Sequence, residues 1–101
     1  IKNILEIYND FVKETVYGVI TNRHKIDEYA NKYLTNWSLD RLGNTDQAII
    51  RMAIYELMYT DTPSVVVINE AVELAKLYSD DAVKGMINSV LDKIYHEEKN
   101  A

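Results

Sequence analysis

The sequence contains no cysteine and only 3 glycines and 1 proline among its 101 residues. The absence of cysteine excludes a disulfide framework, a thiolate metal site and a cysteine nucleophile. It suits a reducing cytoplasm, where we expect the protein to act. The scarcity of glycine and proline argues against long irregular segments. No apolar run approaches the roughly 20 residues that a transmembrane helix needs, so we expect no membrane association.

Basic residues are outnumbered: 11 Lys and Arg stand against 16 Asp and Glu, a net charge of −5. An acidic chain gains little from long-range attraction to phosphate. If nucleic acid is the ligand, binding needs a local basic patch, a basic partner or a further basic segment. The chain begins at Ile1 without an initiator methionine. We therefore expect an incomplete N-terminus, although processing could produce the same start.

Apolar residues recur at helical spacing almost throughout, which predicts an all-α fold. The spacing predicts five helices, at about residues 10–22, 25–34, 45–59, 65–78 and 82–96. The third helix is the most informative, since only Arg51 and Glu56 are charged between Ala48 and Tyr59. A helix that is apolar almost all round is typically buried on several sides. We expect residues 1–101 to form a single domain, a compact helical bundle of about five helices around this apolar central helix.

The ends of these helices carry more specific expectations. Asn9 or Asp10 can cap the first helix. Helical spacing places four apolar residues on one face of it: Val12, Val16, Val19 and Ile20. The four apolar residues that begin at Val65 favour a strand by propensity alone, but the spacing beyond them is helical, so we predict a helix there. The tail from Glu97 is expected to fray.

No arrangement of residues supports catalysis. His24 and His96 are far apart in the sequence, and neither has a second histidine at helical spacing, so each is expected to be an ordinary surface histidine. Asp80 and Asp81 lack the alternating ligands of a calcium loop, and a helix cap is the better interpretation. There is no glycine-rich phosphate loop. We expect a binding protein without metal or cofactor, and not an enzyme.

Aromatic residues are abundant, with 8 tyrosines, 1 Phe and 1 Trp. Tyr55 and Trp37 have apolar neighbours and are expected to fill the core. Tyr78 is open to two interpretations: it stacks on an unpaired base, or it packs the corner between two helices. Asn69 and Asn88 lie in apolar runs, so we expect them to be half-buried and bonded to backbone groups.

Three blocks, in this order, resemble the NusB family. The block at 41–57 reads RLGNTDQAIIRMAIYEL and is similar to the family's central helix. The block at 67–76 reads VINEAVELAK, and the block at 86–93, MINSVLDK, resembles the family's closing motif. The resemblance extends from about Tyr8 to Tyr95 and implies an all-α bundle.

The resemblance implies a bacterial transcription antitermination factor. With NusE, a small-subunit ribosomal protein, such a factor binds the boxA element of nascent RNA and helps RNA polymerase to read through terminators. A basic partner would then share the RNA contact. An alternative is the NusB-like RNA-binding domain of an rRNA cytosine methyltransferase. The polar end, residues 97–101, resembles a natural terminus and favours the first interpretation.

Two departures from the family pattern bear on the site. The family's arginine-rich segment and first helix are not found here, so we expect part of the core to lie open. The Phe and Gly of the closing motif are replaced by Met86 and Ser89. Carried over by position, the resemblance implies RNA-binding residues at Tyr33, Tyr78, Lys84 and Met86. It implies residues that face NusE at Asp40 and Asp46.

Overall fold

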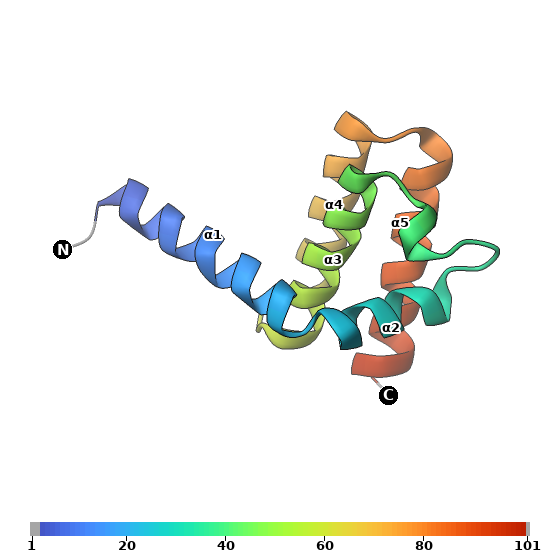
Figure 1. Cartoon of the computed structure of the whole chain (residues 1–101), viewed down its shortest axis with the longest axis horizontal. Coiled ribbons are helices and arrows are strands. Elements are labelled where there is room, and N and C mark those ends of the chain that lie inside the picture. Colours follow the sequence, from blue (N-terminus) through green and yellow to red (C-terminus); the bar gives the residue numbers. More distant parts are fainter. Residues whose placement is uncertain (1–2, 101) are drawn as a thin grey trace.

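The computed structural model describes residues 3–100, and within that range every regular element is a helix (Figure 1). The α-helices are α1 (Ile4–Thr21), α2 (Arg23–Tyr33), α3 (Asn44–Tyr59), α4 (Ser64–Tyr78) and α5 (Asp81–Ile94). A short 3₁₀ helix, η1 (Leu39–Arg41), precedes α3, and a π-helical turn, η2 (Tyr95–Lys99), extends α5. The prediction of an all-α bundle of about five helices is confirmed.

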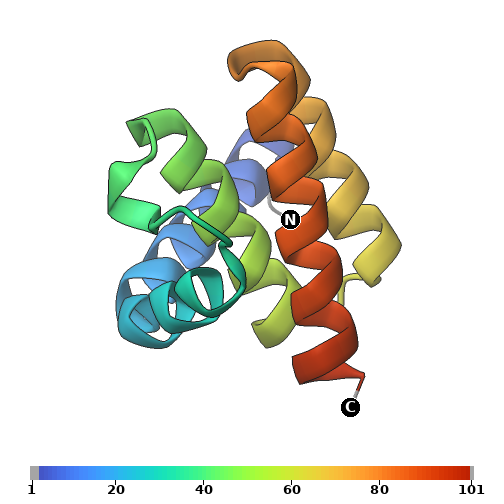
Figure 2. The ribbon, with the colours of Figure 1, turned by 90° about the vertical axis from the view of Figure 1, so that its right-hand side faces the viewer.

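The predicted central helix, α3, lies between α2 on one side and α4 and α5 on the other (Figure 2). Five of its residues are buried, each at most 5% exposed: Ile49, Ile50, Ala53, Ile54 and Leu57. The apolar stripes of α2, α4 and α5 close around them. This confirms that α3 is the centre of the core.

Helix α1 begins six residues before the predicted start. The side chain of Asn3 accepts a hydrogen bond from the backbone N–H of Glu6 at 2.8 Å, so Asn3 caps the helix. Asn9 and Asp10, which were expected to cap it, lie inside the helix. Inside a helix, Asn or Asp costs at most about 0.7 kcal/mol relative to Ala, so both residues can lie within a longer helix that another residue caps.

Helix α1 extends away from the bundle along the longest dimension of the molecule, which measures 48 Å (Figure 1). Of its 18 residues only Thr15 is buried. Nine large apolar side chains are exposed on it: Ile4, Leu5, Ile7, Tyr8, Phe11, Val12, Val16, Tyr17 and Ile20. The expected apolar face therefore exists but is mostly open. Within residues 3–100, no helix combines the length and apolarity that crossing a membrane requires.

The C-terminal part of α1 is the part that contacts α3. Gly18 lies against the ring of Tyr55, and a Cβ at position 18 would overlap that ring. Thr15 also turns inward, with its hydroxyl donating to the carbonyl of Phe11 at 3.0 Å. Tyr55 is half-buried and packs on the core, as predicted.

Three local expectations were wrong. Trp37 is 50% exposed, because the connector turns at Asn36, whose positive φ of 66° suits asparagine. Asn69 and Asn88 are not bonded to backbone groups within the core, because the buried positions of α4 and α5 lie on other faces of these helices. The tail from Glu97 does not fray through its first residues, since η2 continues to Lys99.

Candidate functional site

Three of the four predicted RNA-binding residues come from the corner where α4 ends and α5 begins. Tyr78 is the last residue of α4 and is 66% exposed, so it does not pack the corner. Lys84 lies in the first turns of α5, and Met86 is half-buried against the core. Asp80 caps α5 by accepting the backbone N–H of Val83 at 2.9 Å, as the sequence predicted.

The charges of this corner limit what it can bind. The ammonium group of Lys84 lies 3.6 Å from the carboxylate of Asp81, so its charge is partly satisfied within the chain. Asp80 adds a second carboxylate. The corner therefore offers an accessible aromatic ring rather than a surplus of positive charge. Such a surface suits contact with an unstacked base more than contact with a phosphate.

Tyr33 lies at the opposite end of α5 from the other three residues. It is the last residue of α2, and its hydroxyl donates to Glu98 in η2 at 3.2 Å. Helix α5 has 14 residues and is about 21 Å long at 1.5 Å per residue. The structure thus divides the four predicted RNA-binding residues between two places.

Lys32 joins Tyr33 in this second place. Its ammonium nitrogen lies 3.3 Å from both carboxylate oxygens of Glu98 and 5.4 Å from the centre of the Tyr33 ring. The hydrogen bond to Glu98 raises the pKa of Lys32 above its ordinary value. Sequence reasoning missed Lys32 and Glu98, because residues 66 positions apart carry no shared pattern.

The two acidic residues expected to face a partner differ in their surroundings. Asp40 is exposed in η1. Asp46 lies in the first turn of α3 and is half-buried, and its carboxylate accepts a hydrogen bond from the hydroxyl of Ser79. Since Ser79 follows Tyr78 directly, this bond attaches the start of α3 to the α4–α5 corner. The structure therefore brings Asp46 next to the aromatic corner.

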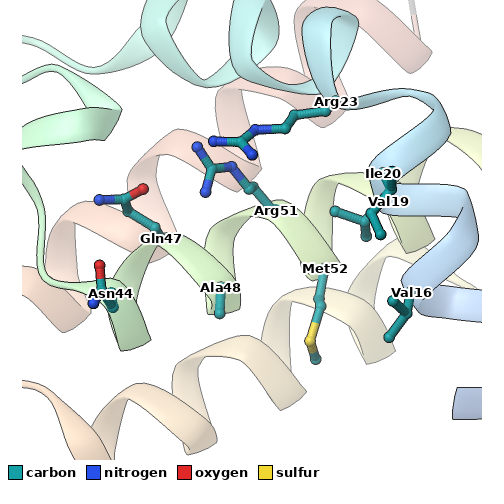
Figure 3. Close-up of a pocket in the computed structure, with 9 residues that line it drawn as sticks. All are labelled: Val16, Val19, Ile20, Arg23, Asn44, Gln47, Ala48, Arg51 and Met52. Carbon is teal, nitrogen blue, oxygen red and sulfur yellow. The ribbon is translucent and has the colours of Figure 1, made fainter.

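A groove of about 340 Å³ lies between α1 and α3, on a side of α3 that was not predicted as a site (Figure 3). Its walls are mostly apolar, with two guanidinium groups and two amides at one side: Val16, Val19, Ile20, Arg23, Asn44, Gln47, Ala48, Arg51 and Met52. Figure 3 shows the side chains of Arg23 and Arg51 next to each other.

Both arginines are bound to one carboxylate. Arg51 donates to the two oxygens of Asp27 at 2.9 and 3.2 Å, and Arg23 lies 3.6 Å from the same group. The charge of Arg51 in a nearly apolar helix is a signal that its side chain has an acidic partner. Its partner could not be identified from the sequence, because Asp27 lies on another helix.

The described residues contain no group of three or more His, Asp or Glu side chains placed to hold a metal ion. His24 and His96 are exposed, as expected. His24 lies 3.1 Å from the carboxylate of Glu28 on the same helix, and His96 in η2 lies 3.4 Å from that of Asp92 on α5.

Comparisons with known proteins agree with this architecture. The model of the NusB family matches residues 1–96. The transcription antitermination protein NusB of Bacillus licheniformis is 47% identical over 85 residues, covering 83% of this chain and 66% of that protein. The Bacillus pumilus protein of the same name is 43% identical over 90 residues, covering 88% of this chain and 69% of the relative.

A solved structure shares the fold. A structure of T. maritima NusB matches with a TM-score of 0.81 and 36% sequence identity, covering 87% of this chain and 63% of that chain. This chain thus spans about two thirds of the length of its relatives. The family model, the relatives and the shared bundle lead to one conclusion: this chain belongs to the NusB family.

Proposed function

We propose that the chain is a transcription antitermination factor that binds boxA-type single-stranded RNA together with NusE. Relatives 43% and 47% identical to it carry the name transcription antitermination protein, and these names favour this role over that of a methyltransferase domain. RNA polymerase would be engaged indirectly, through the complex. The role implies a cytoplasmic protein.

The observation that carries the proposal is the hydrogen bond between Asp46 and Ser79. It joins an acidic position to the corner that bears the exposed ring of Tyr78. A basic protein docked on the acidic side would then supply positive charge next to the aromatic corner. This arrangement would explain how a chain with a net charge of −5 takes part in RNA binding. The partner, and not this chain, would provide most phosphate contacts.

The partner surface is tested by reversing charge at the two acidic residues. Asp46→Lys should weaken NusE binding at least tenfold, about 1.4 kcal/mol, and Asp40→Lys should have a smaller effect. Because Asp46→Lys also removes the bond to Ser79, the control is Ser79→Ala, which breaks that bond and keeps the carboxylate. Titration calorimetry against NusE measures all three. Unchanged affinity for both charge reversals would remove these residues from the interface.

The RNA surface is tested at the aromatic corner. Tyr78→Ala should weaken binding of a boxA-type RNA by the NusE complex, because one stacking contact contributes about 1–3 kcal/mol. Its effect should be nearly independent of salt, since no charge is removed. Tyr17→Ala is the matched control, because Tyr17 is 70% exposed and lies on α1. Equal losses for the two variants, measured by fluorescence anisotropy, would contradict a site at Tyr78.

A further inference from the structure

The C-terminal turn η2 folds back onto the bundle through its last residues. The ammonium group of Lys99 donates to the backbone carbonyl of Leu57 at 2.6 Å, close to the end of α3. The backbone N–H of Asn100 donates to the carbonyl of Tyr95 at 2.8 Å and closes the turn. Between these contacts Glu98 lies against the end of α2. The turn therefore fixes a carboxylate at one particular place on the bundle.

That place is a second corner, at the end of α2, where two hydrogen-bond donors meet: the ammonium group of Lys32 and the hydroxyl of Tyr33. Glu98, whose side chain is only 20% exposed, accepts a hydrogen bond from the hydroxyl of Tyr33 at 3.2 Å and two from Lys32 at 3.3 Å. Lys32 itself is 60% exposed, so its ammonium group is open to solvent on its other side. A cation and a hydroxyl that converge on one oxyanion are also the donors that a phosphate oxygen accepts.

We propose that the corner formed by Lys32 and Tyr33 is a binding site for a phosphate group of single-stranded RNA, and that Glu98 occupies it in the absence of RNA. The inference rests on the proposed RNA-binding function and adds Lys32 to its residues. Glu98 then acts as an internal competitor. When RNA displaces it, the corner gains one positive charge, and the ring of Tyr33 no longer carries a hydrogen bond to the turn.

The ion pairs of the other lysines show why replacement of Glu98 by a phosphate would matter. Lys25, Lys76 and Lys84 also lie within 3.6 Å of carboxylates, so these cations are partly neutralised as well. Those three pairs lie within single helices, whereas the pair of Lys32 joins α2 to η2. A pair between two separate elements is lost when one of them shifts relative to the other, whereas a pair within one helix is held by that helix. Pairs exposed to solvent are also weak and screened by salt, so a strand of phosphates can replace one.

Neighbouring glutamates provide a matched test. Glu98→Gln removes the competing charge but keeps an oxygen for Tyr33, while Glu97→Gln removes the same charge from an exposed neighbour. With the NusE complex and a boxA-type RNA, fluorescence anisotropy should show binding about three- to tenfold tighter for Glu98→Gln. Glu97→Gln should change it less than twofold. Adding Lys32→Ala to Glu98→Gln should abolish the gain.

Each result decides between the proposals. Equal gains in RNA affinity for Glu98→Gln and Glu97→Gln would mean that net charge alone explains the effect, which would overturn the site. Weaker binding by Glu98→Gln would mean that the carboxylate supports the bound state, which also overturns it. If wild type binds RNA and responds to Tyr78→Ala but not to changes at Glu98 or Lys32, this inference fails alone. If no variant binds RNA, the proposed function fails and this inference with it.

A second experiment tests whether the ligand of this site is RNA or free phosphate. Inorganic phosphate is titrated into Glu98→Gln at constant ionic strength, and nuclear magnetic resonance follows the signals of Lys32 and Tyr33. Weak binding, in the millimolar range and lost with Lys32→Ala, is expected for a single phosphate group. Phosphate that binds as tightly as the RNA would overturn the assignment of RNA as ligand.

Discussion

Helices α1 and α3 have similarly apolar sequences and opposite environments. Helix α3 has five buried residues among 16, while α1 has one among 18. The difference comes from position, because α3 is covered by α2, α4 and α5, while only the C-terminal part of α1 reaches the bundle. An apolar pattern therefore predicts that a helix forms and which face is apolar, but not whether that face is covered. Contiguous exposed apolar patches mark surfaces that bind another protein, a membrane or a ligand.

The largest expected effect lies in the core. Leu57→Ala should lower the free energy of unfolding by about 2–5 kcal/mol, because Leu57 is fully buried and the substitution leaves a cavity. Urea denaturation followed by circular dichroism measures it. A midpoint equal to that of wild type would mean that α3 is not the centre of the core.

A smaller loss of stability is expected where the Arg51–Asp27 ion pair joins α3 to α2 beside the groove. Arg51→Ala should cost about 1.5–3 kcal/mol, because it removes two charge-assisted hydrogen bonds from Asp27. Arg51→Lys keeps the charge but loses the paired geometry and should recover only part of the loss. Full recovery by lysine, in the same urea experiment, would show that charge alone matters there.

The third prediction tests the open face directly. Phe11→Ser removes a larger side chain than Leu57→Ala does, yet it should change the free energy of unfolding by only about 0.5 kcal/mol or less, since Phe11 is 57% exposed. Urea midpoints of the two variants give the comparison. A loss as large as that of Leu57→Ala would show that the face of α1 is covered in solution.

The smallest effect concerns Glu56, which is half-buried on α3. Burial raises its pKa above the ordinary value, and the nearby Glu70 raises it further. A raised pKa means that the folded state holds the proton to higher pH than the unfolded state, so stability falls as pH rises between the two pKa values. Glu56→Gln should therefore be slightly more stable than wild type at neutral pH.

That gain should vanish on acidification toward the unfolded value of about 4.3. Thermal midpoints at neutral and acidic pH give the comparison, and Glu97→Gln on the exposed last turn is the control. A difference between Glu56→Gln and wild type that grows as pH falls would reverse the sign of this account.

The sequence predicted what repeats along it and missed what joins distant parts. The nearly uncharged stretch from Ala48 to Tyr59 correctly predicted that α3 is buried at the centre of the bundle, because composition and helical spacing are local properties. The Asp27–Arg51 and Tyr33–Glu98 contacts were missed, because each joins two helices. Of the candidate site, the residues were named from resemblance, and their division between two ends of α5 emerged only from the packing.

The exposed position of Trp37 determines how this protein can be observed by fluorescence. It is the only tryptophan, and half of its surface is already in water in the folded state. Its emission should therefore shift little when the chain unfolds, and circular dichroism is the better measure of stability. Because Trp37 lies three residues before Asp40, the same indole should instead respond when a partner covers that connector. Because unfolding should change the fluorescence of Trp37 little, a change in its emission would report mainly that a partner has bound.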